Sequence, residues 1–533
     1  GKEEGAAGNA GGSGDNAAKT AEGDGASAPK EEAGQPADDQ NKIQFPLAEP
    51  VTISIFGRSH SASNKPNGEL KVFQDLEKKT NVLIDWDSVP DQQLIERKNL
   101  IFASNEMPDA FYGLGMLSNE EVVRFGSQGF LMPLEDLIDE YAPNLLQVFE
   151  TRPELRNKIT APDGHIYSLP LLHEANFFLS PPALFINKAW LDQLGRDIPK
   201  TTEEFYEVLK AFRDNDMNGN GQQDEIPLSF GNNNISGPYA LSGSFGIMDR
   251  PFTHLYIDNG QVKFVPAEEG YKEYVKYLHR LYSEGLIDRE VFTHDANVYQ
   301  AKLRSEEPIV GAFLGWMLSS VFGDSETDYV AIPPLQGPDG HALWMRGNFD
   351  ESLGAFAVSS TNKHPEITIA WVDQIYEETT SIEHTWGPIG HNLQRNADGN
   401  YEFLPIPEGM GYGAFRHSET TGAAGLHIMT LERSVKIIQG PQKEKMDIVD
   451  IYLPYLEEEI YPNVLMSEED GKTLSRIQSE MTTQNGYIDS TFAKWVVGGK
   501  IDEEWDRHLD QLQRLGLEEL LDIYQRYYDA VMK

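Results

Sequence analysis

Residues 51–112 decide the fold class, and they read VTISIFGRSHSASNKPNGELKVFQDLEKKTNVLIDWDSVPDQQLIERKNLIFASNEMPDAFY. Val51, Ile53 and Ile55 alternate with polar residues, which is typical of a half-buried strand, and Gly57 predicts a turn after it. Further segments then alternate, with helical spacing at 72–76, a strand at 82–86, helical spacing at 94–102 and a short strand at 108–112. Strands that alternate with helices indicate α/β lobes with mostly parallel sheets.

The length of the chain predicts more than one lobe. Its 533 residues exceed the size of about 250 to 300 residues at which a single hydrophobic core stops growing. We expect lobe 1 to contain residues 48–165 with a return segment around 321–385, and lobe 2 to contain residues 166–320 with much of 386–533. Residues 1–45 are rich in Gly, Ala, Ser, Asp and Glu with hardly an apolar side chain, so we expect a disordered tether.

The composition excludes several classes of partner. A formal net charge of −41 argues against nucleic acid, whose binding requires clustered Lys and Arg, and against docking on anionic lipid. The chain has no cysteine, which excludes disulfides, thiolate metal sites and a cysteine nucleophile. No apolar run approaches the roughly 18 residues of a membrane span.

Residues 214–227, DNDMNGNGQQDEIP, place side-chain oxygens on alternate positions around two glycines, as a short loop does when it wraps Ca²⁺. Counted from Asp214, the segment fits the EF-hand pattern with Glu225 at position twelve. Counted from Asp216, Gly221 lies at the turn, and we prefer this register because the first puts Gly221 where an EF-hand carries an apolar residue. Its ligands are Asp216, Asn218, Asn220, the Gln222 carbonyl, Asp224 and Glu225. An Asx-rich turn that caps the preceding helix is the alternative.

Several short segments together form a family signature. They are IYSLP at 166–170, LFINKAWLDQLG at 184–195, the PKTTEEF run at 199–205, DEIP at 224–227, ASNEMPD at 103–109 and WGPIG at 386–390. In combination they resemble the extracellular solute-binding proteins of carbohydrate ABC importers. They are most similar to the calcium-containing group that includes the alginate-binding proteins and the Paenibacillus and Bacillus oligosaccharide-binding lipoproteins.

The resemblance implies a two-lobed α/β clamp of the periplasmic-binding-protein type, with a hinge and an interlobe cleft. It implies a substrate-binding component that captures an oligosaccharide and delivers it to the permease subunits of the importer without catalysing a reaction. It further implies a monomeric, extracellular lipoprotein that reaches a Gram-positive membrane only through its lipid anchor, and structural Ca²⁺ in the second register above.

Aromatic side chains stack on the apolar faces of sugar rings, so loop tryptophans are candidate sugar contacts. Trp316 follows the apolar run 311–315, where a strand end is expected to face the cleft, and Trp386 begins a glycine-rich stretch that predicts a loop. The resemblance places cleft tryptophans at both positions. Weaker candidates are Trp344, Arg58, His60, Glu174 and Asn176. Trp190, Trp371, Trp495 and Trp505 fall on helical patterns and are expected to be structural.

Two other classes of function remain open. A secreted, calcium-containing glycosidase or polysaccharide lyase would share this size and acidity, and a carboxylate pair at glycosidase spacing could be present among 85 acidic residues. The chain has no Gly-x-Ser-x-Gly elbow, His-Glu-x-x-His helix or phosphate-binding loop, which disfavours other hydrolases and nucleotide-dependent enzymes. A cell-wall adhesin on a stalk would explain the tether but not the loop tryptophans.

Overall fold

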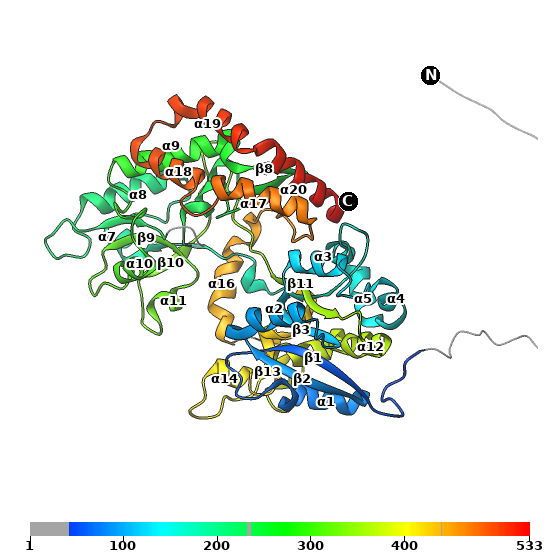
Figure 1. The fold of residues 1–533 in the computed structure, drawn as a ribbon. Helices are drawn as coiled ribbons and strands as arrows, with labels where there is room; N and C mark the ends of the chain where they lie inside the picture. The colour runs from blue at the N-terminus through cyan, green and yellow to red at the C-terminus, as the bar shows by residue number, and fades with distance from the viewer. Residues whose placement is uncertain (1–41, 232–235, 439) are drawn as a thin grey trace, which may run out of the picture. The chain divides into compact units, whose positions relative to one another are not determined.

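The computed structural model describes residues 42–231, 236–438 and 440–533 (Figure 1). The chain divides at Lys42, and Ile43–Lys533 form the unit described below. The predicted tether falls almost wholly outside the described residues. Leu47 donates its backbone N–H to the carbonyl of Thr80 at 2.9 Å, which ties the start of the described chain to the first lobe.

Lobe 1 is built on a six-stranded sheet in the order β14-β4-β11-β3-β1-β2. The bounds are β1 Val51–Ser59, β2 Val82–Pro90, β3 Ala110–Leu117, β4 Leu169–His173, β11 Asp350–Val358 and β14 Ile428–Met429. β1 pairs in parallel with β2 and β3, as the sequence predicts, but β11 is antiparallel to both β3 and β4. The strand β11 returns from the second lobe, so its direction follows from chain path and not from the local β/α alternation.

Gly57 lies inside β1 and not in a turn. A Cβ atom at this position would lie 2.6 Å from a ring carbon of Trp86 on the neighbouring strand, so the glycine makes room for the indole. The sequence prediction of a turn was therefore wrong. The strand continues to Ser59 and places Arg58 near its carboxyl end.

Helices cover the lobe 1 sheet and a small accessory sheet adjoins it. The helices are α1 Lys71–Thr80, α2 Leu94–Ser104, α3 Asn119–Ser127, α4 Glu135–Tyr141, α5 Pro143–Thr151, α6 Pro153–Ile159, α12 Pro365–Tyr376, α13 Glu378–Trp386, α14 Tyr412–Arg416 and α15 Leu431–Ser434. The accessory sheet has the order β12-β13-β15, with β12 Leu393–Arg395, β13 Tyr401–Phe403 and β15 Ile437–Ile438. One continuous apolar core joins the large sheet to α1–α6 and α12.

Lobe 2 has a four-stranded mixed sheet in the order β10-β5-β9-β6. The strands are β5 Ala183–Asn187, β6 Ile226–Ser229, β9 Val310–Gly315 and β10 Tyr329–Ile332. The helices around its core are α7 Lys188–Gln193, α8 Thr202–Asp214, α9 Glu269–Ser283, α10 Ala296–Leu303, α11 Leu318–Phe322, α16 Lys443–Tyr452, α18 Tyr487–Gly498 and α19 Ile501–Leu515. A third core joins the hairpin β7 Leu255–Asp258 and β8 Gln261–Phe264 to α17 Glu468–Met481 and α20 Leu517–Met532.

Among the described elements, the chain passes between the two lobes three times. The first crossing is residues 174–182, from β4 to β5, and the second is residues 333–349, from β10 to β11. The third passage lies between β15 in lobe 1 and α16, which packs on the lobe 2 core. Three passages between the lobes give the two-lobed α/β arrangement that the resemblance implies.

The lobe boundaries differ in detail from the predicted ones. β4 follows residue 165 and belongs to lobe 1, so the first crossing begins at residue 174. β10 belongs to lobe 2, so the return to lobe 1 begins after residue 332 and not at 321. Residues 387–438 supply β12–β15 to lobe 1, and only the later part of 386–533 joins lobe 2. These strands are short, and sheet membership depends on hydrogen-bond partners far away in the chain.

The amphipathic helices α8, α9, α19 and α20 pack their apolar faces on the lobe 2 and third cores, and Gly516 separates the last two with φ 103°. Thr201 caps α8 by accepting from the backbone N–H of Glu204 at 3.1 Å. The carboxylate of Glu204 accepts from the N–H of Lys200 at 2.7 Å, one residue before the position that a regular capping box uses. The four tryptophans expected to be structural, Trp190, Trp371, Trp495 and Trp505, are all buried.

Candidate functional site

Two pairs of strand ends lie where the first crossing leaves the lobe 1 sheet and enters the lobe 2 sheet. In lobe 1, His173 at the end of β4 is the partner of Asp350 at the start of β11. In lobe 2, Ala183 at the start of β5 is the partner of Gly315 at the end of β9. Trp316 directly follows the β9 end, Glu174 and Asn176 follow the β4 end, and Trp386 contacts His173. Arg58 and His60 lie at the end of a different strand, β1.

Trp316 follows β9 directly, as predicted, and its side chain is half-buried. The ammonium nitrogen of Lys445, on α16, lies 4.1 Å from the centroid of the indole ring. The same nitrogen donates to the backbone carbonyls of Trp316 at 2.8 Å and Pro181 at 3.0 Å. Burial lowers the pKa of Lys445 to about 7.

Trp386 is the last residue of α13 and is 2 % exposed. The loop predicted for this position begins one residue later, at Gly387, whose φ of 108° ends the helix. The guanidinium of Arg416 lies 3.9 Å from the indole centroid and donates to the carbonyl of Thr385 at 3.2 Å. The ring of His173 meets the indole edge-on at 5.6 Å, and the indole N–H has no hydrogen-bond partner among the described residues.

Trp344 packs in the core and does not face a binding surface. It is 1 % exposed, and its ring stacks on Tyr452 with centroids 4.5 Å apart. Its indole N–H donates to the hydroxyl of Ser180 at 3.1 Å and the carbonyl of Pro182 at 3.2 Å. The structure therefore corrects this candidate: Trp344 fastens the first crossing to α16, a contact that no local pattern reveals.

Arg58 and His60 lie at the end of β1. The Arg58 guanidinium donates to the carboxylate of Asp91 at 2.6 Å and to the carbonyl of Leu114. The ring of His60 stacks on the ring of His417 with centroids 3.6 Å apart and an interplanar angle of 8°. Burial lowers the pKa of both imidazoles, that of His417 to about 4, so the stacked pair is uncharged at neutral pH.

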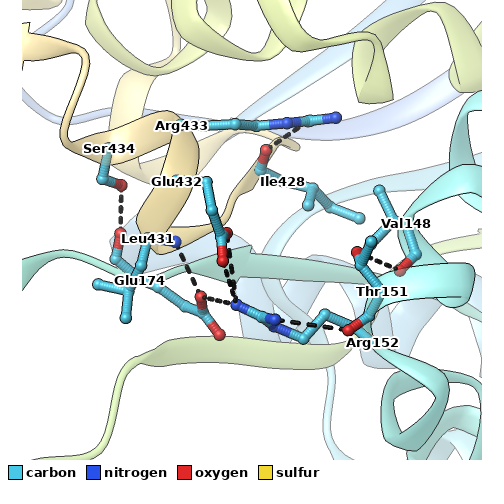
Figure 2. A network of polar contacts seen from close by, with 9 residues as sticks. All are labelled: Val148, Thr151, Arg152, Glu174, Ile428, Leu431, Glu432, Arg433 and Ser434. Carbon is cyan, nitrogen blue, oxygen red and sulfur yellow. Dashed lines mark hydrogen bonds and ion pairs between the residues drawn. The ribbon is translucent and has the colours of Figure 1, made fainter.

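Glu174 and Asn176 lie on the first crossing. Figure 2 shows that the Glu174 carboxylate accepts from the guanidinium of Arg152 at 3.0 Å and from the backbone N–H of Leu431 at 2.9 Å. The hydroxyl of Ser434 donates to the Glu174 carbonyl. Glu174 is thus committed to joining the crossing to α15 and to the turn between α5 and α6. Asn176 begins a short 3₁₀ helix, Asn176–Phe178, and is half-buried.

A cavity of about 990 Å³ lies between α6, the second crossing and the C-terminal end of the chain. Glu174 lines this cavity, as do Arg250, Arg346 and the ion pair between Lys158 and Glu351, whose atoms are 2.8 Å apart. None of the tryptophans lines it. Glu174 and the preceding residue His173 have different surroundings, since His173 contacts Trp386 instead.

Lobe 1 contains a group of buried polar side chains, of which sequence reasoning named only Trp386. Within the described residues, polar atoms of the following side chains are buried and lack a hydrogen-bond partner: His173, His384, His417, His427, Asn392 and Trp386. Burial lowers the pKa of His173 and His384 to about 3. A histidine inside an apolar run, as in Leu171-Leu172-His173, is the one local signal for this group. Lys445 gave no signal, because the helix around it is rich in charged residues.

The predicted calcium loop is closed by its own hydrogen bonds. The carboxylate of Asp216 accepts from the N–H groups of Gly219 and Gly221, both at 2.8 Å, and the two glycines have φ values of 74° and 77°. The side-chain amides of Asn218 and Asn220 donate to the Asp224 carboxylate at 3.1 and 2.9 Å. Within the described residues, no three His, Cys, Asp or Glu side chains are placed to hold a metal ion.

The loop nevertheless carries the donor set that Ca²⁺ requires. One carboxylate oxygen of Glu225 is buried without a hydrogen-bond partner, and the other accepts from the N–H of Met217 at 2.6 Å. Rotating the amides of Asn218 and Asn220 by half a turn would present their oxygens to the space beside Asp224. That arrangement of oxygens is favourable only around a cation.

Comparison with known proteins identifies the family. The model of the family described as bacterial extracellular solute-binding protein matches residues 62–378. The chain is 35 % identical over 504 residues to the fructooligosaccharide ABC transporter substrate-binding protein FusA of Streptococcus pneumoniae, covering 91 % of this chain and 92 % of FusA. Among the described residues, no helix combines the length and apolar composition needed to cross a bilayer.

Solved structures agree with the sequence comparison. FusA in complex with kestose has a TM-score of 0.69 at 34 % identity, covering 90 % of this chain and 99 % of that one. A FusA EF-hand mutant in complex with fructo-nystose has the same TM-score and coverage at 33 % identity. A solute-binding protein of Bifidobacterium longum infantis, associated with an ABC transporter and binding HMO, has a TM-score of 0.75 at 26 % identity, covering 91 % and 100 %. The chain therefore belongs to the bacterial extracellular solute-binding proteins.

Proposed function

We propose that this protein is the substrate-binding component of a carbohydrate ABC importer and that it captures a fructose-containing oligosaccharide between its two lobes. The observation that carries the proposal is the end-to-end similarity to FusA, at 35 % identity over 91 % of the chain. The described lobes also follow the structure of FusA with kestose, at a TM-score of 0.69. The neutral ligand of that relative is compatible with the acidic composition here, which would disfavour a long polyuronate.

Trp316 from lobe 2 is the proposed stacking residue, and Arg58, His60 and Asn176 are proposed to hydrogen-bond to sugar hydroxyls. Trp386 is left out because it is 2 % exposed and Arg416 lies over one face of its ring. The support is that Trp316 directly follows β9, Arg58 and His60 lie at the end of β1, and Asn176 lies on the first crossing. Apolar ring faces combined with a few polar donors are the usual composition of a sugar-binding cleft. Glu174 is left out because its carboxylate already accepts hydrogen bonds from Arg152 and Leu431.

Calorimetric titration with kestose and nystose tests the proposal, and maltotriose is the matched control of similar size. We expect micromolar or tighter binding of the fructans and a change in tryptophan fluorescence. Scattering should show contraction on binding if the lobes close, which a stalk-borne adhesin would not show. The absence of binding heat with every fructan tested would refute the assignment of substrate class.

We further infer that the protein catalyses no reaction on the sugar. The known relatives are binding proteins, whereas a glycosidase or lyase would release new reducing ends from its substrate. Prolonged incubation with fructans and plant polysaccharides, followed by a reducing-sugar assay, separates the two. Accumulation of reducing ends above a heat-denatured control would favour the enzyme.

We also propose that Asp216, Asn218, Asn220, Gln222, Asp224 and Glu225 hold a structural Ca²⁺. The support is the oxygen-rich loop with its two left-handed glycines, and the EF-hand that was mutated in a FusA structure 33 % identical to this chain. An extracellular setting would supply millimolar calcium, which suits modules with dissociation constants near about 10⁻⁴ to 10⁻³ M. Elemental analysis of protein purified without chelator tests the proposal.

Location and partners complete the proposal. The family is extracellular, and we propose a monomer held on the outer face of a Gram-positive membrane by a lipid anchor, with the importer's permease as its partner. A homologous lipoprotein of Bacillus subtilis, LipO, is 25 % identical over 374 residues and supports the anchor. Metabolic labelling with a radioactive fatty acid in a Gram-positive host would detect acylation of the full precursor.

A further inference from the structure

We infer that Lys445 is a positioning residue for sugar binding: it holds the Trp316 indole in its binding orientation by fastening that residue to the first crossing. The inference rests on the proposed function, because it concerns the same site. It assigns a role to a lysine that would not itself touch the sugar.

Three segments of the chain converge on one ammonium group. Lys445 extends from α16, and its nitrogen donates to the carbonyl of Trp316 after β9 and to the carbonyl of Pro181 on the first crossing, at 2.8 and 3.0 Å. The same nitrogen lies 4.1 Å from the indole centroid. One cation therefore fixes both the backbone and the ring of Trp316 relative to the crossing.

Lys445 is 0 % exposed, so water does not replace these contacts. A desolvated cation over an indole face is among the stronger cation–π arrangements, and ammonium hydrogen bonds to carbonyls strengthen in a medium of low dielectric constant. The cation covers one face of the ring. The opposite face is the one that the proposal leaves to the sugar.

Few other charges act on this lysine. Glu444, its neighbour on α16, raises its pKa, but burial dominates and brings the pKa down to about 7. The Glu444 carboxylate accepts from the N–H of Ser319 at 3.1 Å. The segments that Lys445 contacts, residues 177–182 and 310–322, contain no ionisable side chain. The strand β10 also packs on α16 and contributes Tyr329, whose pKa is raised by burial. The charge that holds Trp316 is thus lost as the pH rises above about 7.

The two consequences of this titration have opposite signs. Between pH 7 and 10 the unfolded chain holds the lysine proton and the folded chain does not, so this group makes the fold more stable as the pH rises. Sugar affinity should fall over the same interval, because the ammonium that positions Trp316 disappears. A lysine with a purely structural role would change stability with pH and leave affinity unchanged.

The test compares the wild type with Lys445→Arg, which keeps a cation, and Lys445→Met, which keeps the length without the charge. Kestose titrations from pH 6 to 9 should show wild-type affinity falling with pH, Lys445→Arg binding independently of pH, and Lys445→Met binding about tenfold or more weakly at pH 6. Wild-type binding that stays constant across this range, or full affinity in Lys445→Met, would overturn the inference.

A sugar-free measurement separates this inference from the proposed function. The tryptophan emission of the wild type should titrate with a midpoint near pH 7, and Trp316→Phe and Lys445→Met should each abolish that transition. Lack of a Trp316-dependent transition would overturn the inference even if kestose binds. Binding of no fructan, with the transition present, would overturn the proposed function and leave the coupling of Lys445 to Trp316 established.

Discussion

At the scale of single residues, three tryptophans named by the sequence have three different surroundings. Trp316 is half-buried with a lysine on one face, Trp386 is buried with an arginine on one face, and Trp344 is buried against Tyr452. Because truncating a core indole costs stability whereas truncating a stacking anchor costs affinity, the three give a graded comparison.

Trp316→Ala should weaken kestose binding by about 1 to 3 kcal/mol with little loss of stability, because the residue is only partly buried and its ring is proposed to stack on the sugar. Trp344→Ala should lower the free energy of unfolding by about 3 to 5 kcal/mol and leave the affinity of the folded protein nearly unchanged. Trp386→Ala should likewise lower the free energy of unfolding, because that indole is 2 % exposed. Calorimetry and denaturant unfolding measure the two quantities, and unchanged affinity in Trp316→Ala would remove it from the site.

Glu174 provides a second prediction at the residue scale, with a control in the same network. Glu174→Gln should lower the free energy of unfolding by about 1.5 to 3 kcal/mol, because its buried carboxylate accepts from Arg152 and Leu431. Glu432 also lies near Arg152, at 3.5 Å, but its side chain is 70 % exposed, so Glu432→Gln should cost less than about 1 kcal/mol. Equal effects of the two variants in urea unfolding would contradict this account.

At the scale of elements, α8 and the loop that follows it form a capped helix and a tight turn. Thr201 caps the start of α8, and the helix ends at Asp214, where the oxygen-rich loop begins. The loop side chains satisfy the backbone N–H groups of Gly219 and Gly221 even without an ion. Calcium would therefore add stability to a loop that is already turned, and would not create the turn.

Chelation should lower the melting temperature if the loop holds Ca²⁺. At free calcium about a hundredfold above the dissociation constant, binding stabilises the fold by about 2.7 kcal/mol. Asp224→Ala should reproduce the effect of the chelator, and Ca²⁺ should restore stability better than Mg²⁺ because the loop offers a large, flexible set of oxygens. Differential scanning calorimetry measures each effect.

Asp214→Ala is the control that distinguishes the two registers. Asp214 is a ligand in the EF-hand register, but in the structure its carboxylate pairs with Arg213 at 2.7 Å. In the register that begins at Asp216, Asp214→Ala should leave the calcium response intact. A loss equal to that in Asp224→Ala would support the EF-hand register instead, and a melting curve indifferent to chelator in the wild type would leave an Asx-rich turn.

At the scale of the whole molecule, the ionisation of buried lobe 1 histidines makes the stability of the fold depend on pH. Burial holds the pKa of His173 and His384 at about 3 and that of His417 at about 4, and it holds the pKa of His427 well below the ordinary value of 6.5. As the pH falls below 6.5, these histidines take up protons in the unfolded chain before they do so in the folded chain. Asp373 acts in the opposite direction, because burial raises the pKa of its carboxyl to about 6.

The protein should therefore lose stability steeply as the pH falls from 6.5 toward 4. Each neutral buried imidazole contributes up to about 1.4 kcal/mol per pH unit in this interval. Four of them outweigh the three carboxyls whose pKa burial raises, Asp350, Asp373 and Glu383. His384→Gln should reduce the slope of unfolding free energy against pH by the contribution of one buried imidazole. His391 is exposed, and His391→Gln should leave this slope unaltered. Urea unfolding at half-unit pH steps measures the slope, and equal slopes in all three proteins would contradict the prediction.

The sequence by itself determined what depends on local periodicity. Alternation at Val51–Ile55 and the helical stripes gave the α/β class, the apolar run ending at Gly315 placed Trp316 at a strand end, and the chain length gave two lobes. The strands and helices follow from intervals of two or 3.6 residues, which neighbouring residues alone specify. The two lobes follow from chain length. The oxygen-rich loop could likewise be recognised from adjacent residues.

Only the tertiary structure decided what depends on residues far apart in the chain. It buried Trp344 against Tyr452, committed Glu174 to Arg152 and Leu431, and placed Lys445 on Trp316. It also inserted β11 antiparallel to β3 and made the lobe boundaries follow sheet membership. A side chain's ionisation and its availability to a ligand depend on the groups that surround it in space, and three passages between the lobes assemble those groups from distant segments.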